Sequence, residues 1–132
     1  MTIVLLATDS DDLFRSVDAA LAADDVEVQR ITEGSSVVPA IQAVQPDFVL
    51  LDLQIGNMGG VAACIAIRQE EGAQRLDQRP VALLLDRKDD IFIAQQAKAD
   101  GWLIKPLNSL RLRKLFTTLS DGESYHEQLV PD

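Results

Sequence analysis

The apolar run Phe48–Leu53, with the sequence FVLLDL, constrains the fold more than any other stretch of the chain. A continuous apolar run of this length, preceded by Pro46 and followed by Gly56, is typical of a parallel strand that is buried on both faces. A carboxylate inside such a strand would be costly, but at the carboxyl end it can border a ligand crevice. Asp52 is therefore either a residue that caps the strand or the reactive centre of a site.

Short apolar runs and helical patterns alternate along the rest of the chain. They predict strands at residues 3–7, 26–31, 48–53, 81–85 and 102–104. They predict helices at residues 13–21, 37–44, 61–70, 91–99 and 109–119, with Asn108 or Ser109 capping the last helix. This alternation indicates an α/β fold with a doubly wound parallel sheet. The polar and acidic residues 120–132 predict a disordered tail, which leaves residues 1–119 as the domain.

The composition restricts the functions that the chain can have. Its 132 residues suffice for one domain with a core, and 47% of them are hydrophobic, as in a globular protein. The net charge of −9 argues against a nucleic-acid surface, which needs clustered Lys and Arg. Cys64 is the only cysteine, so we expect it in the core without an intramolecular disulfide. With no signal peptide or membrane-spanning stretch, the sequence predicts a soluble cytoplasmic protein.

Three of the predicted strands have a charged residue at or next to their carboxyl end. Asp9 follows the first strand, Asp52 ends the third, and Lys105 follows the fifth. Because these strand ends meet at the switch point of a doubly wound sheet, we expect the three side chains to lie side by side. Two carboxylates and a backbone carbonyl suit Mg²⁺, and a lysine suits a phosphate. The combination is what an in-line phosphoryl transfer to a carboxylate requires.

Four sequence motifs together resemble the receiver domain of bacterial two-component response regulators. They are residues 46–53, the loop Asn57–Gly60, the pair Pro80-Val81 and residues 100–106. The resemblance covers residues 2 to about 119. It implies a flavodoxin-like (βα)5 fold with the strand order 2-1-3-4-5.

The resemblance assigns a role to each residue of this constellation. Asp52 would be the phosphoacceptor and, together with Asp9 and the backbone carbonyl of Gln54, a ligand of Mg²⁺. Lys105 would contact the phosphate. The phosphoryl group would come from a histidine kinase or a phosphotransfer protein, and the chain would be a signalling protein rather than an enzyme.

The sequence departs from the family pattern at the positions that transmit the signal. Thr8 stands where receivers carry an acid, so we expect weaker Mg²⁺ binding. Leu85 replaces the hydroxyl residue that contacts the phosphate, and it has no hydrogen-bond donor. Asp86 replaces a small residue and would repel a phosphoryl group. Trp102 occupies the aromatic switch position, and we expect it to be partly exposed at a partner surface.

These features leave three hypotheses. The first is a receiver that is phosphorylated on Asp52, and the second is a pseudo-receiver that binds proteins without phosphorylation. In either case a downstream protein or a second copy would bind the surface of residues 91–119, where Ile91–Ile93 adds apolar side chains; no nucleic acid or membrane would take part. The third is an enzyme or cofactor carrier on the same scaffold, but the acidic loop Thr8–Asp12 has no glycine to hold a cofactor phosphate.

Overall fold

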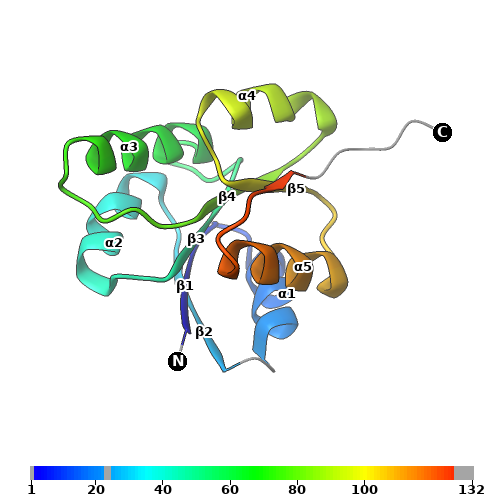
Figure 1. The fold of residues 1–132 in the computed structure, drawn as a ribbon. Helices are drawn as coiled ribbons and strands as arrows, with labels where there is room; N and C mark the ends of the chain where they lie inside the picture. The colour runs from blue at the N-terminus through cyan, green and yellow to red at the C-terminus, as the bar shows by residue number, and fades with distance from the viewer. Residues whose placement is uncertain (1, 23–24, 127–132) are drawn as a thin grey trace.

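The computed structural model, which describes residues 2–22 and 25–126, is a parallel sheet between two layers of helices (Figure 1). The strands are β1 Thr2–Ala7, β2 Val26–Ile31, β3 Phe48–Asp52, β4 Val81–Leu85, β5 Gly101–Ile104 and β6 Tyr125–His126. The helices are α1 Asp11–Leu21, α2 Val37–Val44, α3 Gly60–Gly72, α4 Ile91–Gln96 and α5 Ser109–Ser120, with 3₁₀ turns η2 Gly34–Ser36 and η3 Lys88–Asp90. The strand order is β2-β1-β3-β4-β5-β6, which confirms the predicted order of the first five.

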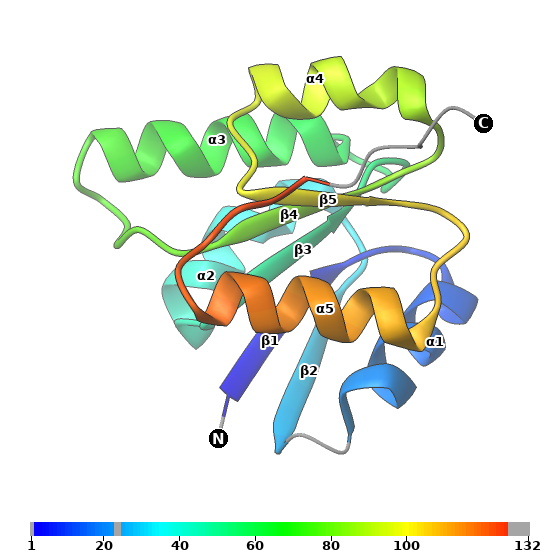
Figure 2. The same ribbon diagram turned by 45° about the vertical axis from the view of Figure 1, so that its right-hand side comes forward.

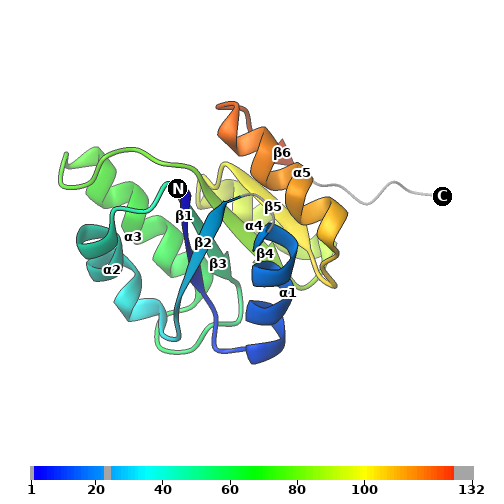
Figure 3. The ribbon, with the colours of Figure 1, turned by 90° about the horizontal axis from the view of Figure 1, so that it is seen from below.

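The sheet separates two apolar clusters. On one face, alternate strand residues such as Leu6, Leu50 and Leu84 pack against α1 and α5. On the other face, residues such as Leu51 and Leu83 pack against α2, α3 and α4. Figure 3 shows α2 and α3 on one side of the sheet and α1 and α5 on the other. None of the described helices has an apolar stretch long enough to span a lipid bilayer.

The sheet has one strand more than the sequence predicts. Tyr125–His126 forms the short strand β6, which runs parallel to β5 in the register Gly101↔Tyr125 and Trp102↔His126. This pair falls within the segment that was expected to be a disordered tail, whereas residues 127–132 of that segment lie outside the described residues. The domain boundary at residue 119 remains a prediction.

Trp102 and Cys64 both belong to the cluster that packs against α2, α3 and α4, and their burial can be compared with the sequence-based expectations. Trp102 is only 1% exposed, so the expectation of a partly exposed aromatic is wrong. It packs beneath α3 and α4 in the same cluster as Leu85. Cys64 is fully buried as predicted, and its thiol donates to the carbonyl of Ala97. Burial raises the pKa of Cys64 to about 11, so the thiol stays protonated at neutral pH.

The loop after β3 takes its left-handed backbone angles at residues other than glycine. Its left-handed residues are Asn57, with φ of 52°, and Met58, with φ of 82°, rather than glycines. The amides of Gly34 and Ser35 donate to the carbonyls of Gly56 and Asn57 at 2.9 and 2.7 Å. A Cβ atom on Gly34 would lie 1.5 Å from the carbonyl oxygen of Met58. A glycine in η2 therefore permits the loop to pack closely against it.

Candidate functional site

The carboxyl ends of β3 and β5 bring Asp52 and Lys105 into direct contact. Asp52 is the last residue of β3, lies between β1 and β4, and is 2% exposed. The Nζ atom of Lys105 is 2.5 Å from Oδ1 of Asp52. Because both side chains are largely removed from water, each charge compensates the other. The predicted meeting of these two residues is confirmed.

Two further donors contact the Asp52 carboxylate. The hydroxyl of Thr8, which is fully buried, donates to Oδ2 at 2.7 Å. The backbone amide of Gln54 donates to Oδ1 at 3.1 Å. The buried carboxylate thus has hydrogen-bond partners on both oxygens, as a buried charge requires. Thr8, at a position where an acid was expected from the family pattern, acts as a donor to Asp52.

Asp86 takes part in the same network. Its Oδ1 lies 3.1 Å from Nζ of Lys105, and its Oδ2 accepts from the side-chain amide of Gln54 at 2.6 Å. Burial opposes ionisation of Asp86, but the hydrogen bonds from Gln54 and Lys105 outweigh it and lower the Asp86 pKa. Burial likewise lowers the Lys105 pKa, but Asp52 and Asp86 outweigh it and raise that pKa. Lys105 is thus a protonated amine shared by two carboxylates.

The remaining predicted residues lie around this network. Asp9 is exposed, and its Oδ2 accepts from the amide of Gly56 at 3.2 Å, which ties the loop after β1 to the loop after β3. Leu85 is fully buried in the cluster that contains Trp102. Its side chain offers no donor to the site, as the sequence predicts.

The sequence analysis missed two side chains that contribute to the site. One is the side chain of Gln54, for which only the backbone carbonyl was considered. The other is Arg30, whose Nε donates to the carbonyl of Thr8 at 3.0 Å and whose guanidinium pairs with Asp11 at 2.7 Å. Arg30 could have been found, because it is the next-to-last residue of a predicted strand, and the end of that strand lies beside the end of β1.

A cleft of about 270 Å³ opens onto Asp52 and Lys105. Its other walls come from α1, the turn before α1 and the segment between β5 and α5: Ser10, Asp12, Leu13, Ser16, Pro106 and Leu107. The cleft therefore connects Asp52 to the surface beside α1 and the segment between β5 and α5.

The site offers oxygen atoms of the kind that Mg²⁺ prefers. Among the described residues, no three His, Cys, Asp or Glu side chains form a cluster that could hold a metal. Mg²⁺ needs only one or two carboxylates when waters and phosphate oxygens complete its shell. The Asp9 and Asp52 carboxylates and the Gln54 carbonyl are hard oxygen ligands of this kind, but their coordination remains a prediction.

Removing the Thr8 hydroxyl should destabilise the fold through Asp52. We expect Thr8→Val to lower the free energy of unfolding by about 1.5–3 kcal/mol, because it deletes a buried hydrogen bond to a charged group while keeping the side-chain volume. Urea unfolding followed by circular dichroism measures this loss. Thr8→Ser, which keeps the hydroxyl, is the matched control, and equal stability of the two variants would contradict the role of the hydrogen bond.

Known proteins resemble the chain in sequence and in fold. The family profile of the response regulator receiver domain matches residues 4–117. The transcriptional regulatory protein CseB of Streptomyces avermitilis is 32% identical over 109 residues, which cover 81% of this chain and 44% of CseB. The DNA-binding response regulator MtrA of Mycolicibacterium smegmatis is 26% identical over 111 residues, which cover 83% of this chain and 46% of MtrA. The chain thus spans less than half the length of these two relatives.

The chemotaxis response regulator CheY4 of Vibrio cholerae has the same fold. Its structure superposes with a TM-score of 0.79 at 23% sequence identity and covers 90% of this chain and 98% of CheY4. The likeness confirms the flavodoxin-like arrangement of the first five strands. Since the family profile also matches most of the chain, this protein belongs to the response regulator receiver domain family.

Proposed function

We propose that this receiver accepts a phosphoryl group on Asp52 from a histidine kinase or a phosphotransfer protein and signals through protein contacts. The observation that carries the proposal is the 2.5 Å contact between Lys105 and Asp52 at the base of an open cleft. A carboxylate held by a lysine at a strand end is suited to attack a phosphorus atom, because the lysine can also neutralise the phosphoryl oxygens.

The proposed step is an in-line displacement. An oxygen of the Asp52 carboxylate forms a bond to phosphorus while the bond from phosphorus to the donor's nitrogen breaks, and that nitrogen keeps the electron pair. Lys105, which contacts Oδ1 of Asp52 before the transfer, then neutralises the oxygens of the acyl phosphate on that residue. Asp9, Asp52 and the carbonyl of Gln54 would hold Mg²⁺, which would neutralise further charge on the phosphoryl group.

The mass of the intact protein tests this function. After incubation with acetyl phosphate and Mg²⁺, the wild type should gain one phosphoryl group, and Asp52→Asn, which keeps the shape of the side chain, should gain none. Because a small donor can fail where a protein donor succeeds, the assay is repeated with phosphorylated histidine kinases. An unmodified wild type in both assays, or equal labelling of Asp52→Asn, would contradict the proposal.

A phosphorylation-independent pseudo-receiver is the second candidate. It is favoured by Leu85, which has no hydroxyl, and by Asp86, which already occupies donors of Lys105 and Gln54. The two candidates differ in whether phosphorylation of Asp52 changes the affinity for a partner protein. If labelling of Asp52 leaves the affinity for a captured partner unchanged, the pseudo-receiver is the better account.

The proposal extends to partners and location. CseB and MtrA are named as a transcriptional and a DNA-binding regulator, but each is more than twice as long as the segment they share with this chain. The net charge of −9 makes these 132 residues a poor surface for nucleic acid. We therefore propose that they act through protein partners, in the cytoplasm.

A further inference from the structure

The two oxygens of the Asp52 carboxylate have different surroundings. Oδ1 is bonded to Lys105, whose side chain is one of the walls of the cleft at the site. Oδ2 accepts from the hydroxyl of Thr8 at 2.7 Å, and Thr8 is fully buried. Figure 2 shows the segments that follow β1 and β5, which begin with Thr8 and Lys105, on the same side of the molecule. A phosphoryl group can therefore reach Oδ1 from the cleft, whereas Thr8 covers Oδ2.

The hydroxyl of Thr8 is fixed in the direction of Oδ2. Its oxygen accepts from the amide of Ser10 at 3.0 Å. An ionised carboxylate only accepts hydrogen bonds, so the hydroxyl proton points to Asp52. The backbone of Thr8 is held as well, because its amide donates to the carbonyl of Ile31 and its carbonyl accepts from Nε of Arg30, both at 3.0 Å. Thr8 is thus a preorganised donor that stays on Oδ2 when Oδ1 reacts.

Phosphorylation changes the charge that the Thr8 hydroxyl contacts. A phosphoryl group on Oδ1 turns the carboxylate of Asp52 into an acyl phosphate, in which Oδ2 is a neutral carbonyl oxygen. A hydrogen bond to an ionised acceptor is roughly twice as strong as one to a neutral acceptor. The hydrogen bond from Thr8 therefore stabilises the free carboxylate more than the acyl phosphate, and it favours loss of the phosphoryl group.

We propose that Thr8 assists the hydrolysis of phosphorylated Asp52 and so shortens the phosphorylated state. A water oxygen forms a bond to phosphorus while the bond from phosphorus to Oδ1 breaks, and Oδ1 keeps the electron pair. Both protons of the water leave with the phosphate. As the carboxylate forms again, negative charge spreads to Oδ2, where the Thr8 proton is already in place to stabilise it. This inference rests on the proposed phosphorylation of Asp52.

Hydrolysis depends on Thr8 more than phosphorylation does. The transition state of phosphoryl transfer is largely dissociative, so the bond between phosphorus and Oδ1 is mostly broken in it. The Asp52 carboxylate then carries much of its charge in the free protein and in the transition state, but not in the acyl phosphate. Loss of the Thr8 hydroxyl should therefore slow hydrolysis more than phosphorylation. A distorted site would instead slow both reactions together.

The lifetime of the acyl phosphate in Thr8→Val tests the proposal. The full chain is labelled with acetyl phosphate and Mg²⁺ or with a phosphorylated histidine kinase. The donor is then removed, and intact mass is followed over time at one Mg²⁺ concentration. We expect hydrolysis to be about tenfold slower than in the wild type, which corresponds to about 1.4 kcal/mol in the barrier. Thr8→Ser, which keeps the hydroxyl, should hydrolyse within about twofold of the wild-type rate.

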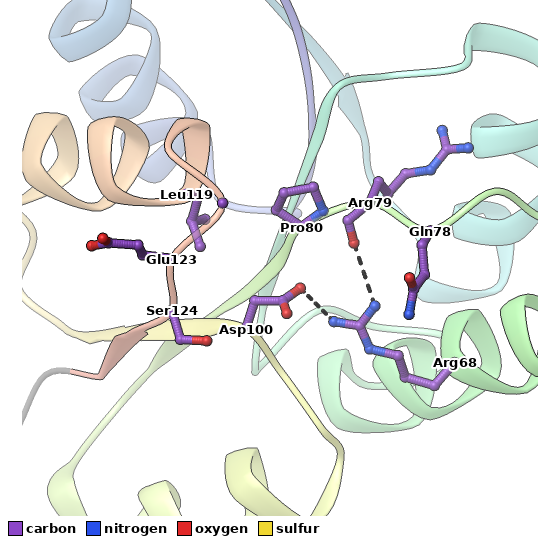
Figure 4. A pocket seen from close by; sticks show the side chains of 9 residues that line it. Arg68, Gln78, Arg79, Pro80, Asp100, Leu119, Glu123 and Ser124 are labelled. Atoms are coloured by element: carbon purple, nitrogen blue, oxygen red, sulfur yellow. Dashed lines mark hydrogen bonds and ion pairs between the residues drawn. The ribbon is translucent and has the colours of Figure 1, made fainter.

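Leu119→Ala controls for the loss of stability. Leu119 is 3% exposed and lies near Pro80 and Asp100, the residues that precede β4 and β5, at the opposite edge of the sheet (Figure 4). This variant destabilises the domain without touching the site, so its phosphoryl group should be lost at the wild-type rate. If circular dichroism shows Thr8→Val to be unfolded, Thr8→Cys replaces it. Its thiol is a weaker donor, so its acyl phosphate should also outlive that of the wild type.

Two results would overturn this inference and leave phosphorylation of Asp52 in place. The first is an equal lifetime of the acyl phosphate in the wild type and in the variant without the hydroxyl. The second is a variant in which labelling slows as much as hydrolysis, which would indicate a distorted site. A wild type that neither donor labels would overturn the proposed function itself, and this inference with it.

Discussion

Replacing Trp102 by alanine should lower the free energy of unfolding by about 3–5 kcal/mol. The side chain is 1% exposed and belongs to the largest fully buried side chains of the described residues. It stands beside Leu83 of the adjacent strand and in the same cluster as Leu85 and Ala94. Truncation would leave a cavity between β5 and α4, in addition to the lost burial of the ring.

Urea unfolding followed by far-ultraviolet circular dichroism measures this loss, because Trp102 is the only tryptophan and fluorescence would vanish with it. Trp102→Phe keeps an aromatic ring and should lose clearly less stability than the alanine variant. In the wild type, the tryptophan emission should be that of a buried indole and resist quenching by iodide. A loss below about 1 kcal/mol would instead indicate a ring near the surface, which buries little on folding.

The position of Trp102 shows where sequence periodicity fails. In a strand that is half exposed, alternation of polar and apolar residues identifies the buried face. All four residues of β5 are buried, so its sequence carries no such alternation. β6 and the two flanking helices cover β5, and the sequence predicts only the helices. The missing strand consists of two residues in a polar segment, too short for any pattern.

The candidate site was predictable to the extent that the sheet fixes it. Asp52 ends β3 and Lys105 follows β5, and only β4 separates these two strands in the parallel sheet. Both residues therefore lie at the carboxyl edge of the sheet, so their meeting follows from the topology. The contacts of Asp86 and of the Gln54 side chain depend instead on the paths of two loops and on side-chain rotamers, which no periodicity encodes. The sequence therefore predicts Asp86 as a source of repulsion but not as a partner of Lys105.

Replacing Asp86 by alanine should accelerate phosphorylation of Asp52 by about tenfold or more. Its carboxylate competes for Lys105 and adds negative charge beside the path of a phosphoryl group. Two like charges about 4 Å apart repel by about 1–4 kcal/mol at effective dielectric constants between those of water and a protein surface. A barrier lower by only 1.4 kcal/mol corresponds to about tenfold in rate. Intact mass against time, with acetyl phosphate and Mg²⁺, measures the rate.

The matched control is Asp89→Ala, which removes the same charge from an exposed residue of the same loop. If the overall electrostatic potential of the protein set the rate, phosphorylation would be accelerated equally in both variants. A specific competition for Lys105 instead predicts faster phosphorylation only in Asp86→Ala. A slower Asp86→Ala variant would mean that the carboxylate assists the reaction, for example as a ligand of Mg²⁺. Asp86→Asn separates the effect of charge from the effect of size. Its side-chain amide can still contact Gln54 but cannot form the ion pair with Lys105.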